Sequence, residues 1–179
     1  MAEFGKDESV LQRVSAATLG GVARKLTGSS ARPENTEISH LRGFGPMTRI
    51  STSFGELPAQ ALRVRDQVRT RNGGFKAVQW VDRIILDTDF LQRHPAALPI
   101  IIRAGSLGHR LPAADIILAP HQPISASQKF HGQPVKRALD AMGRPNVARK
   151  AEPMVTYTLF HCGTPTSVLS EGIWLDVGP

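Results

Sequence analysis

The chain has 179 residues, of which 41% are apolar and 21% charged, and these proportions exclude a disordered or fibrous protein. The formal net charge is +7, and because residues 1–40 hold equal numbers of acidic and basic side chains, the excess lies in residues 41–179. No dense Lys/Arg block with interleaved aromatic residues appears, so a solvated basic surface is favoured over a nucleic-acid-binding one.

The single cysteine, Cys162, excludes an internal disulfide framework and a cysteine-rich zinc module, and it fits a reducing compartment. The six histidines are scattered without the spacing of a metal site, so neither a metal nor a cofactor is expected. Acidic residues at Glu3, Asp7 and Glu8 are unlike the start of a signal peptide, and no apolar run approaches the roughly 20 residues of a membrane helix. These features predict a cytoplasmic protein without a membrane segment.

Residues 7–26 are predicted to form an amphipathic helix whose apolar stripe consists of Val10, Leu11, Val14 and Ala17. A Gly-Gly pair weakens the middle of this helix by roughly 1 kcal/mol per glycine. We therefore expect the stripe to gain stability by docking on the rest of the chain, on a protein partner or on a second copy in a homodimer. Residues 28–40 are polar and contain a proline, which indicates a linker. The sequence thus predicts a helix and linker over residues 1–40 and a separate domain over residues 41–179.

The second region alternates short apolar segments with turn signals, which is typical of an all-β domain. Asn72 and the two glycines after it predict a hairpin turn, because these residues accept positive φ angles. A short helix is expected around residues 135–141, and Asp87 and Asp89 are expected to cap a turn. The predicted strands are residues 49–52, 64–70, 75–86, 98–104, 116–118, 154–160 and 167–169.

Four arginines share the parity of one face of a predicted strand, which would give a basic stripe: Arg63, Arg65, Arg69 and Arg71. Such alternation is more often the solvent side of a half-buried strand. A nucleic-acid-associated module is therefore an alternative function and not the favoured one.

Residues 43–50, GFGPMTRI, resemble the opening block of bacterial Hedgehog/intein (Hint) domains, Cys-Phe-x-x-Gly-Thr-x-Ile. Further blocks of that family follow in the same order. Residues 57–68 resemble V-x-x-L-R-x-G-D, residues 70–81 T-x-D-G-G…V-x-W-I, residues 100–107 P-I-R-I-R-A-G-A-L-G, residues 117–122 L-S-P-x-H, and residues 155–172 V-T-Y…L-A-E-G.

The resemblance implies the Hint fold, a flattened all-β horseshoe with both catalytic blocks near the point where the chain enters the domain. It also implies the family's reaction, an intramolecular acyl shift. In that reaction the first residue, Cys or sometimes Ser, attacks the carbonyl that precedes it. The shift needs a nucleophile, a group that protonates or polarises the scissile amide, and donors for the oxyanion.

Three functional positions depart from the family pattern. Gly43 stands at the nucleophile position and has no side chain with which to attack. Gln122 stands where the family has His, and His121 lies one residue earlier, where a strand would aim it away from the site. The closing His/Glu pattern falls on residues that do not reproduce it: Leu159, His161 and Pro165. The sequence therefore predicts an inactive Hint domain that serves as a scaffold or a protein-binding module.

The alternative is an active, self-cleaving domain that uses displaced residues, such as His121 with Thr48 or Cys162. Thr48 matches a structural Thr of the family, and it does not precede the right peptide bond. A lone cysteine such as Cys162 is more often a small, buried apolar residue than a nucleophile.

Overall fold

The computed structural model describes residues 24–26, 40–125 and 135–179, and every structural statement below concerns these residues. The strands are β1 Arg24–Leu26, β2 Arg49–Thr52, β3 Gly55–Pro58, β4 Gln67–Arg69, β5 Phe75–Ala77, β6 Trp80–Leu86, β7 Ile100–Ile102, β8 Ile116–Leu118, β9 Val147–Arg149, β10 Val155–His161, β11 Thr166–Ser170 and β12 Ile173–Val177. The helix α2 spans Thr88–Arg93, and short 3-10 turns span Ala59–Ala61, Pro95–Ala97 and Ala138–Ala141.

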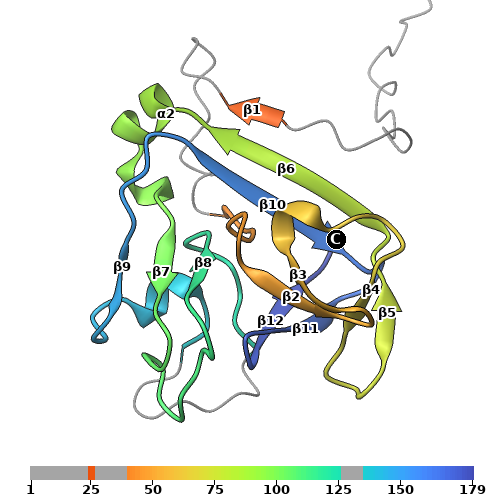
Figure 1. Cartoon of the computed structure of the whole chain (residues 1–179). Helices are drawn as coiled ribbons and strands as arrows, with labels where there is room; N and C mark the ends of the chain where they lie inside the picture. Colours follow the sequence, from red (N-terminus) through yellow and green to blue (C-terminus); the bar gives the residue numbers. More distant parts are fainter. Residues whose placement is uncertain (1–23, 27–39, 126–134) are drawn as a thin grey trace, which may run out of the picture.

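The two longest strands, β6 and β10, run antiparallel across the whole molecule (Figure 1). A four-stranded sheet in the order β3-β2-β4-β5 lies at one end of this pair, and the sheet β8-β7-β9 lies at the other. The hairpin β11-β12 packs beside the first of these sheets. The prediction of an all-β horseshoe built from many short strands is confirmed.

Side chains on opposite faces of β10 enter two different hydrophobic clusters. Phe160 lies in the larger cluster, together with residues of the flanking sheets such as Ile50 and Ile100. Tyr157 points to the other face, where α2 and the 3-10 turn that follows it cover the smaller cluster. The Tyr157 hydroxyl donates to the carbonyl of Ala97 at 2.9 Å, so this buried polar group is satisfied.

Helix α2 was absent from the sequence prediction, although its cap was recognised. The Asp87 side chain accepts a hydrogen bond from the Phe90 N–H and so satisfies a donor at the helix N-terminus. The expectation that Asp87 caps a turn is confirmed, whereas Asp89, which was expected to do the same, lies within the first turn of α2. The short helix expected around residues 135–141 is the 3-10 turn Ala138–Ala141.

Most of the predicted helix over residues 7–26 lies outside the described residues. For its last three residues the prediction is wrong, because Arg24–Leu26 form strand β1 and pair in parallel with Ile84–Leu86 of β6. Main-chain pairing with a sheet edge outweighs the weak intrinsic helix preference of such a short segment.

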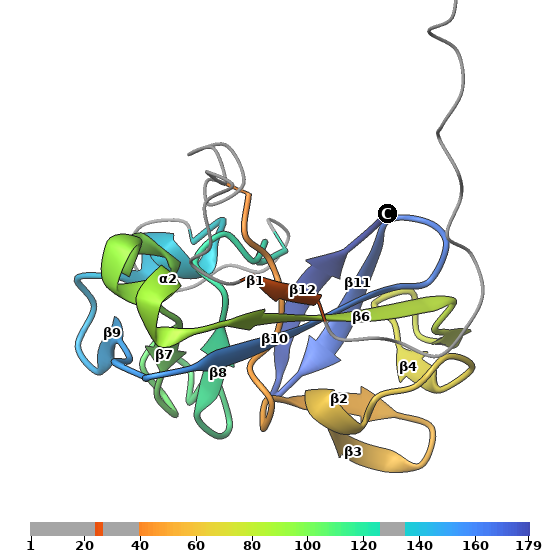
Figure 2. The ribbon, with the colours of Figure 1, turned by 90° about the horizontal axis from the view of Figure 1, so that it is seen from above.

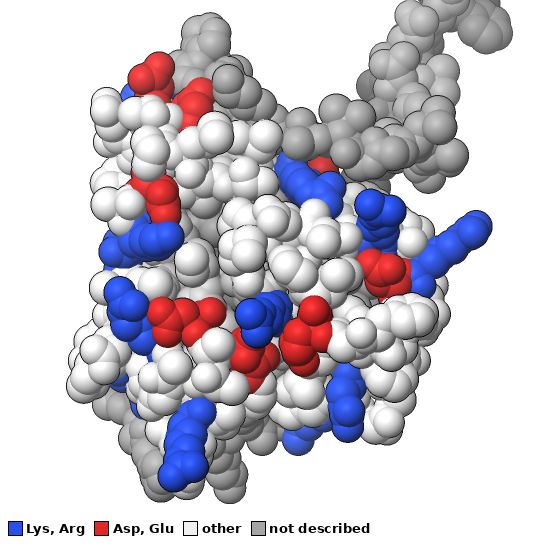
Figure 3. All heavy atoms as spheres, in the orientation of Figure 1, with Lys and Arg blue, Asp and Glu red and all other residues white. Residues whose placement is uncertain are grey.

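The predicted arginine stripe does not form along one strand. Strand β4 is limited to Gln67–Arg69, and Arg63 and Arg65 precede it in a turn. Arg65 adopts a left-handed φ of 78°, which breaks the alternation on which the stripe depends. On the face drawn in Figure 3, Lys and Arg side chains are interspersed with Asp and Glu and do not gather in one patch.

Candidate functional site

The segment that enters the domain at Gly43 is held between two strands. Phe44 exchanges a pair of main-chain hydrogen bonds with Thr158 of β10, each 2.9 Å long. On the other side, the Gly43 carbonyl accepts the Ala119 N–H at 2.9 Å, just beyond the end of β8. The Phe44 side chain is buried against the ring of Phe160, with 5.2 Å between ring centroids. The junction therefore lies in the centre of the fold.

Gly43 adopts a backbone conformation that favours glycine. Its φ is +133°, a region that residues with a side chain rarely occupy. A Cβ atom built on this backbone would lie 2.9 Å from Tyr157 Cβ and 3.1 Å from the Thr158 carbonyl oxygen. In this conformation the direction that a nucleophilic side chain would take is already occupied by β10.

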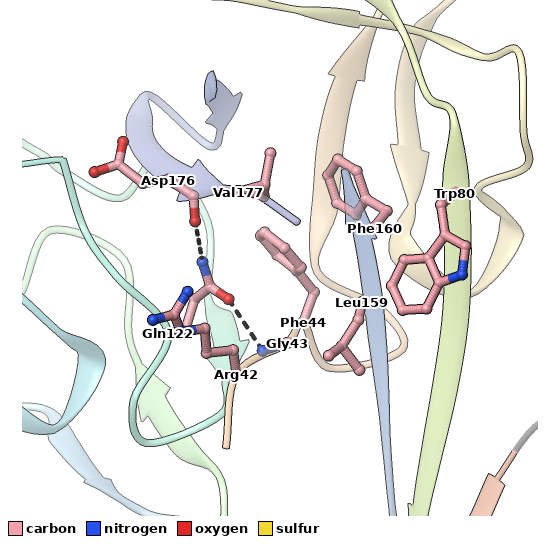
Figure 4. Close-up of a pocket in the computed structure, with 10 residues that line it drawn as sticks. Arg42, Gly43, Phe44, Trp80, Gln122, Leu159, Phe160, Asp176 and Val177 are labelled. Atoms are coloured by element: carbon pink, nitrogen blue, oxygen red, sulfur yellow. Dashed lines mark hydrogen bonds between the residues drawn. The ribbon is translucent and has the colours of Figure 1, made fainter. Parts of the chain in front are cut away.

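Gln122 forms the main polar contact of this junction (Figure 4). Its Oε1 atom accepts the main-chain N–H of Gly43 at 3.0 Å, and this hydrogen bond is buried. Its Nε2 group donates to the carbonyl of Asp176 in β12 at 2.9 Å and to that of Pro123 at 3.3 Å. The amide side chain therefore links the entry segment to the last strand of the domain.

The His121 side chain lies in different surroundings from that of Gln122. Its Nδ1 atom lies 3.3 Å from Nη1 of Arg137, whose guanidinium also donates to the carboxylate of Asp140. Burial, followed by the positive charges of Arg137 and of His40, lowers the pKa of His121. The main chain of His121 still contributes to the junction, because its N–H donates to the Leu41 carbonyl at 3.1 Å.

Thr48 has a structural position in this fold. Its hydroxyl accepts the Ile117 N–H at 3.0 Å and donates to the Ile117 carbonyl at 2.7 Å. The side chain is 2% exposed and thus ties the entry segment to β8. A hydroxyl engaged in both directions is poorly placed to act as a nucleophile.

A cavity of about 60 Å³ opens next to Gly43, with room for a few water molecules at most. Leu159 and Trp80 line it on the side of the β6–β10 ladder, as Figure 4 shows. His161 stacks on Trp80, with 5.3 Å between ring centroids, and its Nδ1 atom accepts the Gly163 N–H at 3.1 Å. An apolar side chain therefore occupies the part of the closing block nearest the junction.

Cys162 packs into the larger hydrophobic cluster and is 2% exposed. Burial raises the pKa of its thiol, which disfavours the thiolate that would be needed for attack. Of the predicted positions, the structure brings Gly43 and Gln122 into direct contact. Thr48 bonds instead to the backbone of Ile117, and the His121 N–H bonds to the backbone of Leu41.

Two contributors to the site escaped the sequence prediction. The Asp176 carbonyl receives the Gln122 side chain, and a main-chain acceptor leaves no trace in a sequence pattern. Trp80 was quoted only as part of a strand motif, yet it is 38% exposed and lines the cavity. Its exposure follows from the fold, so the sequence offered no signal that Trp80 lines a cavity.

The part of the chain that the structure describes contains no helix long and apolar enough to cross a membrane. Within the same residues, no three His, Cys, Asp or Glu side chains gather as a metal site would require.

Two solved structures and one family model are similar to this chain. The crystal structure of the gp41-1 intein resembles this chain with a TM-score of 0.47 and 10% identity, over 75% of this chain and 98% of that one. The crystal structure of the MchDnaB-1 intein gives a TM-score of 0.43 and 14% identity, over 75% of this chain and 99% of that one. No curated protein matches the sequence at a significant level. The family model of the Hint domain matches residues 42–176, more than half of the chain, and the chain therefore belongs to the Hint domain family.

Proposed function

We propose that this Hint domain does not process its own backbone and that it serves as a scaffold or a protein-binding module. The observation that carries the proposal is the state of Gly43. The junction residue has no nucleophilic atom, and its φ of +133° and its contact with β10 leave no room for one.

The acyl shift would require a side chain at position 43 to attack the carbonyl carbon of Arg42. The bond from that carbon to the Gly43 nitrogen would then break, and the nitrogen would need a proton to leave. Here no atom can form the first bond. Removal of a nucleophile in a hydrolase lowers the rate by about six orders of magnitude, which is a guide to the expected loss.

Gln122 also lacks the chemistry for the second half of the step. Its Oε1 atom accepts the Gly43 N–H, so the contact stabilises the intact amide and supplies no proton to the nitrogen. An imidazole can carry a proton to such a position near neutral pH, whereas a carboxamide does not. The same contacts support a structural role, because Gln122 joins three segments of the fold.

His121 and Thr48 do not favour the self-cleaving alternative. The Thr48 hydroxyl is engaged with Ile117, and the His121 ring is held beside Arg137. A cytoplasmic location remains a prediction from the sequence, and so does a protein partner.

Intact-mass measurement of the full-length chain tests the proposal. The protein is kept for several days near neutral pH, with and without a thiol, and a parallel sample receives hydroxylamine to cleave any ester. We expect one species of unchanged mass in every sample. A small fragment together with a large one, from a cut at or near the Arg42–Gly43 bond, would show that the domain is active.

The variants G43C and G43C/Q122H test the geometric part of the argument. We expect both to remain uncut and to be less stable than the unmodified chain, because a Cβ at position 43 meets β10. Cleavage of either variant would show that the backbone can still open enough to place a nucleophile.

A further inference from the structure

The outer edge of β6 offers main-chain groups to a third strand. Because the N–H and carbonyl of Thr158 both bond to Phe44, this residue of β10 faces away from β6. Hydrogen-bonding direction alternates along a strand, so the neighbours of Thr158 in β10 face β6. Given the register Tyr157 to Ile84, the residues of β6 that face outward are the odd-numbered ones, including Ile85.

Strand β1 lies along this outer edge, as both ribbon views show (Figures 1 and 2). It pairs in parallel with β6, with Lys25 opposite Ile85. In a parallel ladder the outward residue bonds to the two residues that flank its partner. The Ile85 N–H is therefore directed at the Arg24 carbonyl, and the Leu26 N–H at the Ile85 carbonyl.

The next outward N–H toward the start of β6 already has an acceptor. The Arg83 N–H donates to Oδ1 of Asp82 at 2.8 Å. An N–H that already has an acceptor offers less to an added strand. Both main-chain groups of Ile85 thus face the outer edge of β6, where β1 pairs with it.

We propose that the β6 edge at Ile84–Leu86 is a strand-docking site that holds the segment upstream of Gly43 in cis, through the main chain of Arg24–Leu26. The proposal deepens the function proposed above, because a domain that leaves its junction uncut retains its upstream segment. The two ideas are separable, since the docked strand would hold that segment whether or not the Arg42–Gly43 bond is intact. The ligand class is an extended peptide segment, recognised through backbone hydrogen bonds as in β-strand addition.

Amide hydrogen exchange in the full-length chain tests the docking without any mutation. The Ile85 and Leu26 amides should exchange at least ten times more slowly than the Lys25 amide, whose N–H points away from β6. Equal exchange at Leu26 and Lys25 would overturn the proposal.

Two proline variants sharpen the test. L26P removes an N–H that the ladder uses, whereas K25P removes one that it does not use. We expect L26P to speed exchange at Ile85 at least tenfold, with Ile84 and Leu86 unchanged because they bond to β10. K25P should leave Ile85 within about twofold of the unmodified chain. Equal effects of the two variants on Ile85, or no effect of L26P, would contradict the docking.

The same samples distinguish the two proposals. If the chain stays uncut and the Ile85 amide is not protected from hydrogen exchange, only the docking proposal is refuted. If the chain is cut at Arg42–Gly43 and Ile85 remains protected, the docking stands and the inactive assignment fails.

Discussion

The side-chain carbonyl of Gln122 accepts the main-chain N–H of Gly43 at 3.0 Å, although the two residues lie 79 positions apart in the chain. The same side chain donates to Asp176, so one amide group connects the entry segment, the segment after β8 and strand β12. A position that the resemblance assigns to a catalytic His is here a buried cross-link. Replacement of the Gln122 side chain should therefore lower the free energy of unfolding.

Replacement of Gln122 by Ala should lower the free energy of unfolding by about 2–3 kcal/mol. The change leaves the buried Gly43 N–H without its acceptor, and an unsatisfied buried donor costs about 1–3 kcal/mol before the lost packing is added. Urea unfolding of Q122A measures the effect. The neighbouring variant H121A is the control and should lose less than about 1 kcal/mol, because the ring is only partly buried. Equal losses would show that the contact between Gln122 and Gly43 has no special weight.

Replacement of Gly43 by Ala should cost about 2–4 kcal/mol. Part of the cost is the strained φ of +133°, and part is the contact of the new methyl group with Tyr157 Cβ and the Thr158 carbonyl. The control is G74A, where a Cβ meets no atom within 4 Å, and its stability should stay within about 0.5 kcal/mol of the unmodified chain. Thermal or urea unfolding compares the two. A G43A protein as stable as G74A would mean that the junction relaxes easily.

The sequence predicted the strands whose signals are local. The turn at Asn72 and Gly73 was recognisable because only a few residue types accept positive φ, and Gly73 has a φ of +87°. The strand expected over residues 64–70 is shorter in the structure because Arg65 turns left-handed and its N–H donates to Val78. That bond joins residues far apart in sequence, and no local pattern reports it.

Strand β12 was missed even though its signal was present. Ile173, Leu175 and Val177 alternate with less buried residues, which is the period of a half-buried strand. The site itself was predictable only as a set of departures from the family pattern at Gly43 and Gln122. The hydrogen bond between them depends on how β8 and β12 come together, which only the fold reveals.

Replacement of Thr48 by Val should lower the free energy of unfolding by about 2–3 kcal/mol, since it leaves the N–H and carbonyl of Ile117 without their partner. The variant T48S keeps the hydroxyl and loses one methyl group, so it should cost only about 1 kcal/mol. Urea unfolding of both variants separates the hydrogen bonds from the packing. If T48V were as stable as T48S, the hydroxyl would have no role in tying the entry segment to β8.

The stability of the domain should depend on the ionisation of His121. Burial and the charge of Arg137 lower the pKa of this His below its usual value of 6.5, so between the two values the unfolded chain binds more protons than the folded one. The free energy of unfolding should therefore rise with pH through this window and fall as the pH drops below 6.5. NMR titration gives the pKa, and urea unfolding on both sides of the window gives the stability. H121N should lose this part of the pH dependence, and an unchanged profile in that variant would assign it to other groups.

The Cys162 thiol should resist modification until the domain unfolds. Burial raises its pKa above 9.0, and the thiolate is the form that reacts, so iodoacetamide should label the native protein at least one hundred times more slowly than the urea-unfolded chain. The raised pKa also means that the folded state keeps its proton above pH 9, so the free energy of unfolding should fall as the pH rises beyond that value. Tyr157, whose pKa burial also raises, contributes to the same alkaline loss, and comparison of C162A with Y157F separates the two groups. Rapid labelling of the native protein near neutral pH would show that Cys162 is accessible and reactive. Cys162 would then again be a candidate nucleophile.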